Sequence, residues 1–235
     1  MTPAASVVVP TCRRPDLLRR CLQGLAEQKV AGGFETIVVD DGHDGGPQRA
    51  ISCVQAAGSR MPIRVLATPR PRSGPAAARN VGWRAARAPW VAFTDDDCVP
   101  LPGWLQGGVE TLAAGADGAR GGIIVPLPGD PTDYEKNAAL LSGAPFATAS
   151  CFYAKEALER VGGFDERFTM AWREDTDLQL TMLEHGLRLV AAPPATAVVH
   201  PVRPARWAVC LWQQRKTQFE ALLYAKHPWL YRRLV

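Results

Sequence analysis

The chain has 235 residues, of which 47% are hydrophobic and 21% charged, and its formal net charge is +4. These values are ordinary for a globular protein with a sizeable core, and they exclude an intrinsically disordered chain. The mild basic excess is spread along the chain, which suits anionic ligands such as phosphates and argues against a nucleic-acid-binding protein.

The six cysteines form no CxxC pair and no zinc-like spacing, so we interpret them as reduced, mostly buried thiols. The N-terminus enters a strand-like run, MTPAASVVVP, without the features of a signal peptide. No segment reaches the roughly 18 consecutive apolar residues of a membrane span. We therefore expect a cytoplasmic, soluble protein without a transmembrane segment.

The first hundred residues alternate between strand and helix patterns. β-branched runs predict buried strands, and apolar residues at helical spacing predict helices between them. The expected strands are 6–10, 35–40, 63–67 and 90–94, and the expected helices are 15–28, 48–57 and 76–86. This alternation predicts an α/β fold with a doubly wound, mostly parallel sheet.

The strict alternation ends after Val125, and the second half is interpreted as an α+β extension of the same sheet. The expected elements there are helices at 101–115, 134–141, 155–161 and 175–185 and strands at 121–125 and 147–153. A last amphipathic helix is expected at 206–226, with Trp207, Leu211, Phe219, Leu222 and Leu223 as its apolar residues. Packing on the core is the preferred interpretation of this helix, and peripheral contact with a membrane or a partner is the alternative.

The strand at 90–94 is followed by three consecutive acids, Asp95, Asp96 and Asp97. Adjacent carboxylates disfavour joint ionisation unless a cation or solvent relieves the repulsion. A divalent metal is one interpretation, and a solvated turn or helix cap is an equally weighted alternative. In doubly wound sheets ligands bind at the carboxyl ends of strands, where Pro10 with Thr11 and Asp40 with Asp41 are also expected.

The usual signatures of dinucleotide binding, P-loop chemistry and serine hydrolases are missing from the sequence. Further along the chain, Glu174, Asp175 and Asp177 gather at an expected helix start, where three acids exceed what capping requires. His200 closes a β-branched run. A lone histidine at a strand end is more often a structural residue than a metal ligand.

Six segments in order resemble the inverting glycosyltransferases of family 2, which have the GT-A fold: VVVPTCRRPDLLRRCL, ETIVVDDG, SGPAAARNVGW, WVAFTDDDCVPLPGWL, VGGFDERF and WREDTDLQL. Each motif alone is weak, but the ordered series from Val7 to about His200 is specific. The resemblance implies a single GT-A domain over 1–235. Its parts would be a nucleotide-binding half (1–100), an acceptor and catalytic half (101–202) and a C-terminal helical segment (203–235).

The resemblance also implies roles for individual residues. Asp95 would meet the ribose of the nucleotide-sugar, Asp97 would coordinate the metal with His200, and Asp175 would be the general base. Asp96 would point elsewhere, so Asp96→Ala should be the mildest of the three alanine substitutions in turnover. The other expected nucleotide-sugar-binding residues are Pro10, Thr11, Arg13, Asp40, Asp41, Arg79 and, as the most expendable of the triplet, Asp96.

Elementary chemistry agrees with these roles. A hard cation with oxygen ligands neutralises a diphosphate leaving group, so Mn²⁺ or Mg²⁺ is expected. One carboxylate base and no identified carboxylate nucleophile imply direct displacement with inversion. Cys98 departs from the polar or acidic residue common at its position in the family, which would alter the polarity of the metal site.

The expected activity is therefore metal-dependent transfer of one sugar per turnover, from a UDP-linked donor to an acceptor hydroxyl. Single transfer is expected because no long extension of the processive type follows His200. A catalytically silent nucleotide-sugar-binding module and a sugar-1-phosphate nucleotidyltransferase are the alternatives. The second should carry a glycine-rich loop after the first strand, where the chain has TCRRP.

Overall fold

The computed structural model describes residues 2–205, 209 and 213–235. Within them, a seven-stranded sheet has the order β3-β2-β1-β4-β8-β6-β9, and a three-stranded sheet has the order β5-β10-β7. The strands of the larger sheet are Ala5–Thr11 (β1), Phe34–Asp40 (β2), Ile63–Ala67 (β3), Trp90–Phe93 (β4), Gly118–Arg120 (β6), Cys151–Ala154 (β8) and Leu189–Ala191 (β9). Those of the smaller sheet are Val99–Pro100 (β5), Gly122–Ile124 (β7) and Ala197–Val199 (β10).

The α-helices are Pro15–Ala26 (α1), Gly46–Ala56 (α2), Pro75–Ala85 (α3), Trp104–Ala113 (α4), Asp133–Ala139 (α5), Lys155–Val161 (α6), Glu174–Glu184 (α7), Gln218–Lys226 (α9) and Pro228–Leu234 (α10). Helices α1 to α7 begin within three residues of where the apolar spacing predicts, whereas α9 begins at Gln218, after a 3₁₀ turn over Gln214–Thr217, and covers only the last part of the helix predicted at 206–226. Proline stands in the first turn of α1, α2 and α3, where its missing N–H costs no helical hydrogen bond.

Strand β1 lies at the centre of the fold because it is buried along its whole length and pairs in parallel with both β2 and β4. β8 is antiparallel to both of its neighbours, β4 and β6, whereas β9 is parallel to β6. The main sheet is thus mixed but mostly parallel, which confirms the predicted α/β class and adds the small second sheet.

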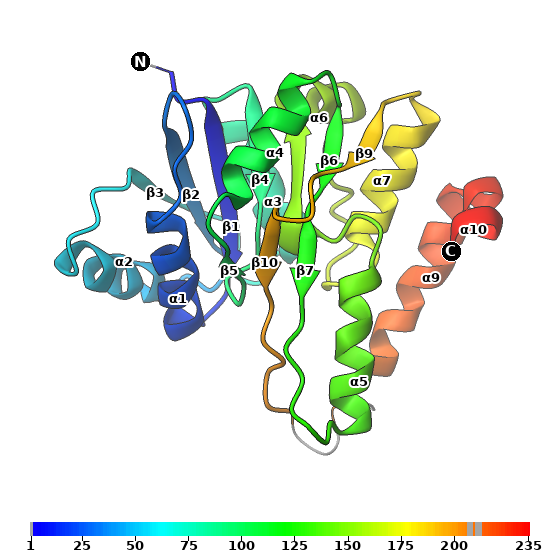
Figure 1. Cartoon of the computed structure of the whole chain (residues 1–235). Coiled ribbons are helices and arrows are strands. Elements are labelled where there is room, and N and C mark those ends of the chain that lie inside the picture. The colour runs from blue at the N-terminus through cyan, green and yellow to red at the C-terminus, as the bar shows by residue number, and fades with distance from the viewer. Residues whose placement is uncertain (1, 206–208, 210–212) are drawn as a thin grey trace.

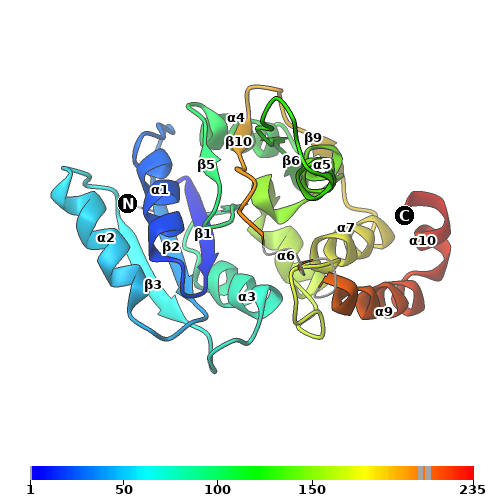
Figure 2. The same cartoon turned by 90° about the horizontal axis from the view of Figure 1, so that it is seen from below.

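Helices cover both faces of the main sheet (Figures 1 and 2). Helices α1, α2 and α4 pack on one face, and α3, α6 and α7 pack on the other. Gly82 lets α3 approach the sheet closely, because a Cβ at this position would lie 2.3 Å from a methyl carbon of Val8. This close packing sets the distance between the side chains of α3 and the carboxyl end of β1.

Four observed elements were not predicted: β5, β6, β9 and α10. The three strands have only two or three residues each, too few for an alternating pattern to be visible. The strand expected at 147–153 is in fact β8, which begins at Cys151 after a 3₁₀ turn over Thr148–Ser150.

The C-terminal helices pack against α7 and the loop before it. Phe219 and Leu223 of α9 are buried in a small apolar cluster with Phe168 and Leu180, as the preferred interpretation of this segment expects. Trp207 and Leu211, also predicted to belong to its apolar face, lie outside the described residues. Across the described part of the chain, no helix combines the length and the hydropathy needed to cross a membrane.

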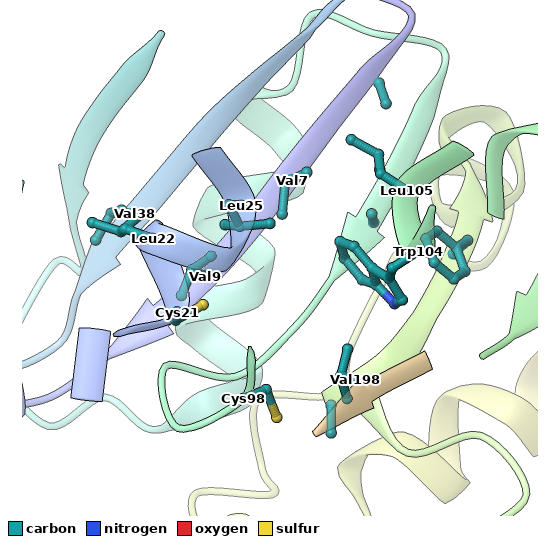
Figure 3. Close-up of a cluster of buried hydrophobic side chains, with 14 of the residues drawn as sticks. Val7, Val9, Cys21, Leu22, Leu25, Val38, Cys98, Trp104, Leu105 and Val198 are labelled. Atoms are coloured by element: carbon teal, nitrogen blue, oxygen red, sulfur yellow. The ribbon is translucent and has the colours of Figure 1, made fainter. Parts of the chain in front are cut away.

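One apolar cluster reaches from beneath α1 and α4 to the end of the sheet that carries the acidic triplet (Figure 3). Cys98 lies at the lower rim of this cluster and is fully buried. Its sulfur points away from Val9 and Trp104, out of the apolar group (Figure 3). The acidic triplet therefore borders directly on a packed core.

Candidate functional site

The acidic triplet occupies the turn that carries the chain from β4 in the main sheet to β5 in the small sheet. The backbone N–H of Cys98 donates to the carbonyl of Asp95 at 3.0 Å and closes this turn. The carboxyl ends of β1, β2 and β4 meet at the edge of the main sheet that faces the viewer in Figure 2. The three acids leave this turn in three directions, and each has its own partners.

Asp95 is held by Arg79 of α3. The Arg79 guanidinium lies 2.7 Å from Asp95 Oδ1 and, through its other terminal nitrogen, 2.9 Å from Glu174 Oε1 at the start of α7. Burial alone would raise the pKa of Asp95, but the adjacent Arg79 charge holds it below its usual value. One buried arginine thus joins the triplet to the second acidic motif.

This position changes the role expected for Arg79. Its side chain is only 3% exposed, and both terminal nitrogens bind carboxylates of this chain. Arg79 therefore positions Asp95 and Glu174, and its contact with a nucleotide base stays a prediction.

Asp96 points into the protein. Its Oδ2 accepts a 2.7 Å hydrogen bond from the hydroxyl of Thr11, and Arg14 lies 3.1 Å from its Oδ1 as an ion pair without hydrogen-bond geometry. Burial, opposed by Arg14 and reinforced by the charge of Asp97, raises the pKa of Asp96 to about 7. Asp96 thus ties β1 to the triplet, a structural contact that the expected ranking of the three acids did not take into account.

Asp97 faces cations on one oxygen and a histidine on the other. Its Oδ2 lies 3.2 Å from Arg203 Nε and 3.6 Å from Arg14 Nη1, while its Oδ1 lies 3.5 Å from His200 Nε2. Asp97 Oδ, His200 N and Cys98 Sγ are all within 4.8 Å of one another. This spacing and this donor set fit one divalent cation bound by Asp97 and His200, the two residues predicted for it.

The two acids at the end of β2 accept hydrogen bonds from residues of neighbouring loops. Asp40 Oδ1 accepts backbone N–H groups of Gly42 and His43 at 2.8 and 3.0 Å. Asp41 accepts from the Thr68 hydroxyl at 2.8 Å and from the backbone of Ser73 and Gly74. Asp41 therefore holds the loop before α3, while Asp40 stays at the edge of the site.

The end of β1 supplies the remaining predicted residues. Pro10 and Thr11 are buried strand residues, and Arg13 is exposed with a φ of 57°. Arg13 lies against the next loop, since a Cβ on Gly42 would come within 2.9 Å of its side chain. It is Arg14, not Arg13, whose guanidinium reaches the triplet.

In the second acidic motif, too, each acid has partners of its own. At the start of α7, Glu174 binds Arg79, and Asp177 contacts Lys226 at 2.6 Å and His227 at 3.1 Å. Among the described residues Asp175 forms none of these ion pairs. Instead its Oδ1 accepts the N–H of Thr176 at 2.7 Å and a longer hydrogen bond from the same residue's hydroxyl.

The environment of Asp175 suits a proton acceptor. Burial raises the pKa of Asp175, the hydrogen bonds from Thr176 oppose this shift, and the negative charge of Asp95 adds to it. A carboxylate with a raised pKa accepts a proton more readily than an ordinary surface aspartate. Arg79, which binds Asp95, also opposes the rise in the pKa of Asp175, so the same guanidinium acts on both acids.

The loop before α7 is positioned from α3. Asn80 donates to the carbonyl of Phe164 and to Glu166, both at 2.8 Å, and accepts the backbone N–H of Phe164 at 3.0 Å. Gly163 has a φ of +80°, and a Cβ there would lie 2.6 Å from Asn80. The positive φ and the close approach to Asn80 explain why position 163 is a glycine. The hydrogen bonds of Asn80 hold the VGGFDERF segment against α3.

A cavity of about 730 Å³ lies at the opposite, amino-terminal edge of the sheet, between the start of β2 and the start of β3. Its one acid, Glu35, is already satisfied by Ser6 at 2.9 Å, Arg64 at 3.0 Å and the backbone of Arg87. This cavity therefore lacks an available reactive group and is separate from the acidic site.

The sequence interpretation missed three contributors to the site: Arg14, Glu174 and Arg203. Arg14 is adjacent to the predicted Arg13, and only the backbone turn at Arg13 decides which of the two faces inward. Glu174 belongs to the acidic cluster that had been noticed, but no local pattern shows its partner 95 positions away. Arg203 lies in an irregular segment after β10 that carries no pattern at all.

Comparison with known proteins gives relatives for most of the chain. It is 32% identical to the pre-mycofactocin glycosyltransferase of Mycobacterium tuberculosis over 95% of this chain and 48% of that protein. It is 27% identical to a validoxylamine A glucosyltransferase of Streptomyces hygroscopicus over 85% of this chain and 56% of that protein. The chain thus spans about half the length of these curated relatives.

Solved structures share the fold. The mannosyltransferase PcManGT of Pyrobaculum calidifontis, in complex with GDP-Man and Mn²⁺, aligns with a TM-score of 0.70 and 24% identity over 96% of this chain and 64% of that one. TarS of S. aureus in complex with UDP aligns with a TM-score of 0.57 and 20% identity, over 85% and 61% of the two chains. The family model described as Glycosyl transferase family 2 matches residues 6–172. The chain therefore belongs to glycosyltransferase family 2.

Proposed function

We propose that the protein transfers a sugar from a nucleotide-diphosphate donor to an acceptor hydroxyl, with a divalent metal and with inversion at the anomeric carbon. The observation that carries this proposal is the bridge made by Arg79, which holds the donor-side Asp95 and the base-side Glu174 on a single guanidinium. This bridge brings Asp95, the acid assigned to the ribose, and the start of α7, which carries the candidate base Asp175, into one site.

The metal would be held by Asp97 Oδ1 and His200 Nε2, and Mn²⁺ or Mg²⁺ fits the carboxylate and imidazole donors. When bound, such an ion neutralises the diphosphate as it leaves. Arg14 and Arg203, on the other oxygen of Asp97, add positive charge beside the same leaving group. The Mn²⁺ in the PcManGT complex supports this assignment by fold analogy.

Asp175 would remove the proton of the acceptor hydroxyl during attack. The neighbouring Glu174 is buried and paired with Arg79, so it is unsuitable as a carboxylate nucleophile for a two-step, retaining reaction. A single base with no partner nucleophile favours direct displacement, as the resemblance implies. Asp95 is assigned to the ribose, and Thr11 and Asp40 to the nucleotide side.

The donor and product length are further parts of the proposal. We favour a UDP-sugar and one transfer per turnover. Among the structures that share the fold, TarS was determined with UDP and PcManGT with GDP-Man, so both nucleotides belong in the test. The relatives also include a hyaluronan synthase of Pasteurella multocida, which makes product length a necessary measurement.

The experiment is a panel of UDP- and GDP-sugars assayed for hydrolysis and transfer, with and without Mn²⁺ or Mg²⁺. We expect metal-dependent turnover with one nucleotide class and a strong loss in Asp97→Ala and Asp175→Asn. Full turnover in both variants would show that the assigned site is wrong. Tight nucleotide binding by calorimetry with no transfer to any acceptor would instead favour the silent binding module.

A further inference from the structure

Cys98 sits where a metal ligand would be, although its residue type departs from the oxygen donors expected there. Its Sγ lies within 4.8 Å of both the Asp97 carboxylate and the His200 imidazole. The sulfur points out of the apolar cluster in which the rest of the residue is buried (Figure 3). The sulfur is thus turned away from Val9 and Trp104 and is close to both polar donors.

The backbone sets this proximity. β5 and β10 are antiparallel, and Val99 is paired with Val199, so Cys98 and His200 are the next neighbours along the two strands. The N–H of His200 donates to the carbonyl of Ile124 at 2.8 Å, which fixes the backbone of His200 to the small sheet. Asp97 and Cys98 directly precede β5, and His200 directly follows β10, so the pairing of these two strands brings the three donors together.

The distances suit one shared ion. Two ligands at about 2.0–2.2 Å from a metal, at a tetrahedral angle, are roughly 3.4 Å apart, and Asp97 Oδ1 lies 3.5 Å from His200 Nε2. The two arginines occupy Asp97 Oδ2, so Oδ1 stays available to the metal. A thiolate ligand at about 2.3 Å would lie roughly 3.6 Å from each of the other two donors, and the sulfur already lies within 4.8 Å of both.

We propose that Cys98 is a third protein ligand of the metal, so that the site selects a borderline ion such as Co²⁺ or Zn²⁺ over Mg²⁺. This inference rests on the metal site of the proposed function. Thiolate and imidazole donors favour such ions, whereas Mg²⁺ binds almost only oxygen. Because a thiol becomes a ligand by losing its proton, Co²⁺ or Zn²⁺ binding releases that proton to solvent.

The test uses Co²⁺ alone as a probe, because a cobalt–thiolate bond gives a charge-transfer band in the near ultraviolet. We expect this band in the wild-type protein and its loss in Cys98→Ala and Cys98→Ser. Co²⁺ binding, measured by calorimetry, should weaken by about tenfold or more, the loss seen even for outer-shell partners of metal ligands. Thermal unfolding of each variant without metal establishes that it is folded.

Cys53→Ser is the matched control, since Cys53 is exposed on α2. It should keep both the band and the affinity. A band that survives in Cys98→Ala, or that disappears in Cys53→Ser, would overturn the assignment, and so would Co²⁺ binding to the wild type without any thiolate band. Mn²⁺-dependent transfer, assayed in parallel, separates the two proposals. Intact transfer without a thiolate band defeats only the Cys98 ligand, whereas no donor turnover with any metal defeats the proposed function.

Discussion

Replacement of Arg79 by Met tests the bridge between the two acidic motifs. Arg79 and Glu174 are 3% and 4% exposed, and Asp95 is 27% exposed. Arg79→Met keeps most of the side-chain volume over Phe164, where the guanidinium lies 5.8 Å from the ring centre. It leaves Glu174 as a buried carboxylate without its counter-charge.

Removal of one partner from a buried ion pair costs about 3–5 kcal/mol of unfolding free energy. We expect a loss in this range for Arg79→Met, measured by urea unfolding followed by circular dichroism. Arg84→Ala is the control on the same helix. Its 3.5 Å contact with Glu166 joins two side chains that are 52% and 53% exposed, so the expected loss is about 0–1 kcal/mol.

The two losses should therefore differ several-fold. The double variant Arg79→Met, Glu174→Leu should recover part of the stability, because replacing both members of a buried pair by apolar residues removes the uncompensated charge. A loss below about 1 kcal/mol in Arg79→Met, comparable with the control, would refute the view that the bridge organises the site.

Three other predictions concern Asp175, Asp96 and Lys226 of the C-terminal helix α9. Asp175→Asn should lower kcat by about 10²- to 10⁴-fold while nucleotide affinity, measured by calorimetry, stays unchanged. Because burial raises the pKa of Asp175 and only the deprotonated base acts, wild-type turnover should fall as pH drops through that raised pKa. Asp96→Ala should remain the mildest of the triplet in turnover per folded molecule, yet lose about 1–3 kcal/mol in urea unfolding because Thr11 loses its acceptor. A turnover loss larger than that of Asp97→Ala would overturn the assignment. Lys226→Met should lower the free energy of unfolding by about 3 kcal/mol. It should also make that free energy fall less steeply as the pH is lowered. Burial raises the pKa of Asp165, but hydrogen bonds from Arg167 and Lys226 hold it below its usual value. The contribution of Asp165 to the free energy of unfolding is therefore present above roughly pH 4 and lost on acidification. An unchanged dependence of the unfolding free energy on acidic pH would contradict a stabilising contact between Lys226 and Asp165.

The sequence was informative wherever the signal is local. Long buried runs such as β1 and β2 predicted parallel strands, and their ends placed Thr11 and Asp40 at the same edge as the triplet. The bounds of β3 and α6 agree with the predicted ones, because β-branched or apolar spacing and turn residues delimit them without help from the rest of the chain.

The partners of these residues depend on tertiary packing and could not be predicted. The sequence assigned Arg79 to a nucleotide, whereas the close approach of α3 over Gly82 brings its guanidinium between Asp95 and Glu174. Likewise it treated Asp96 as a bystander, although Asp96 is fully buried against Thr11. The two-residue strand β5 is visible only through its pairing with β10. The cytoplasmic location and the membrane contact of the C-terminal helix stay predictions.

The pairing of β5 with β10 has a consequence for how the protein folds. Asp97 and His200 come together only when strands about a hundred positions apart have met, and contacts between such distant segments require the closure of a long loop. The metal donors are therefore complete only once β5 and β10 have paired. A bound ion then stabilises that pairing in particular, since it has affinity for the completed pair of strands and not for the chain that precedes them.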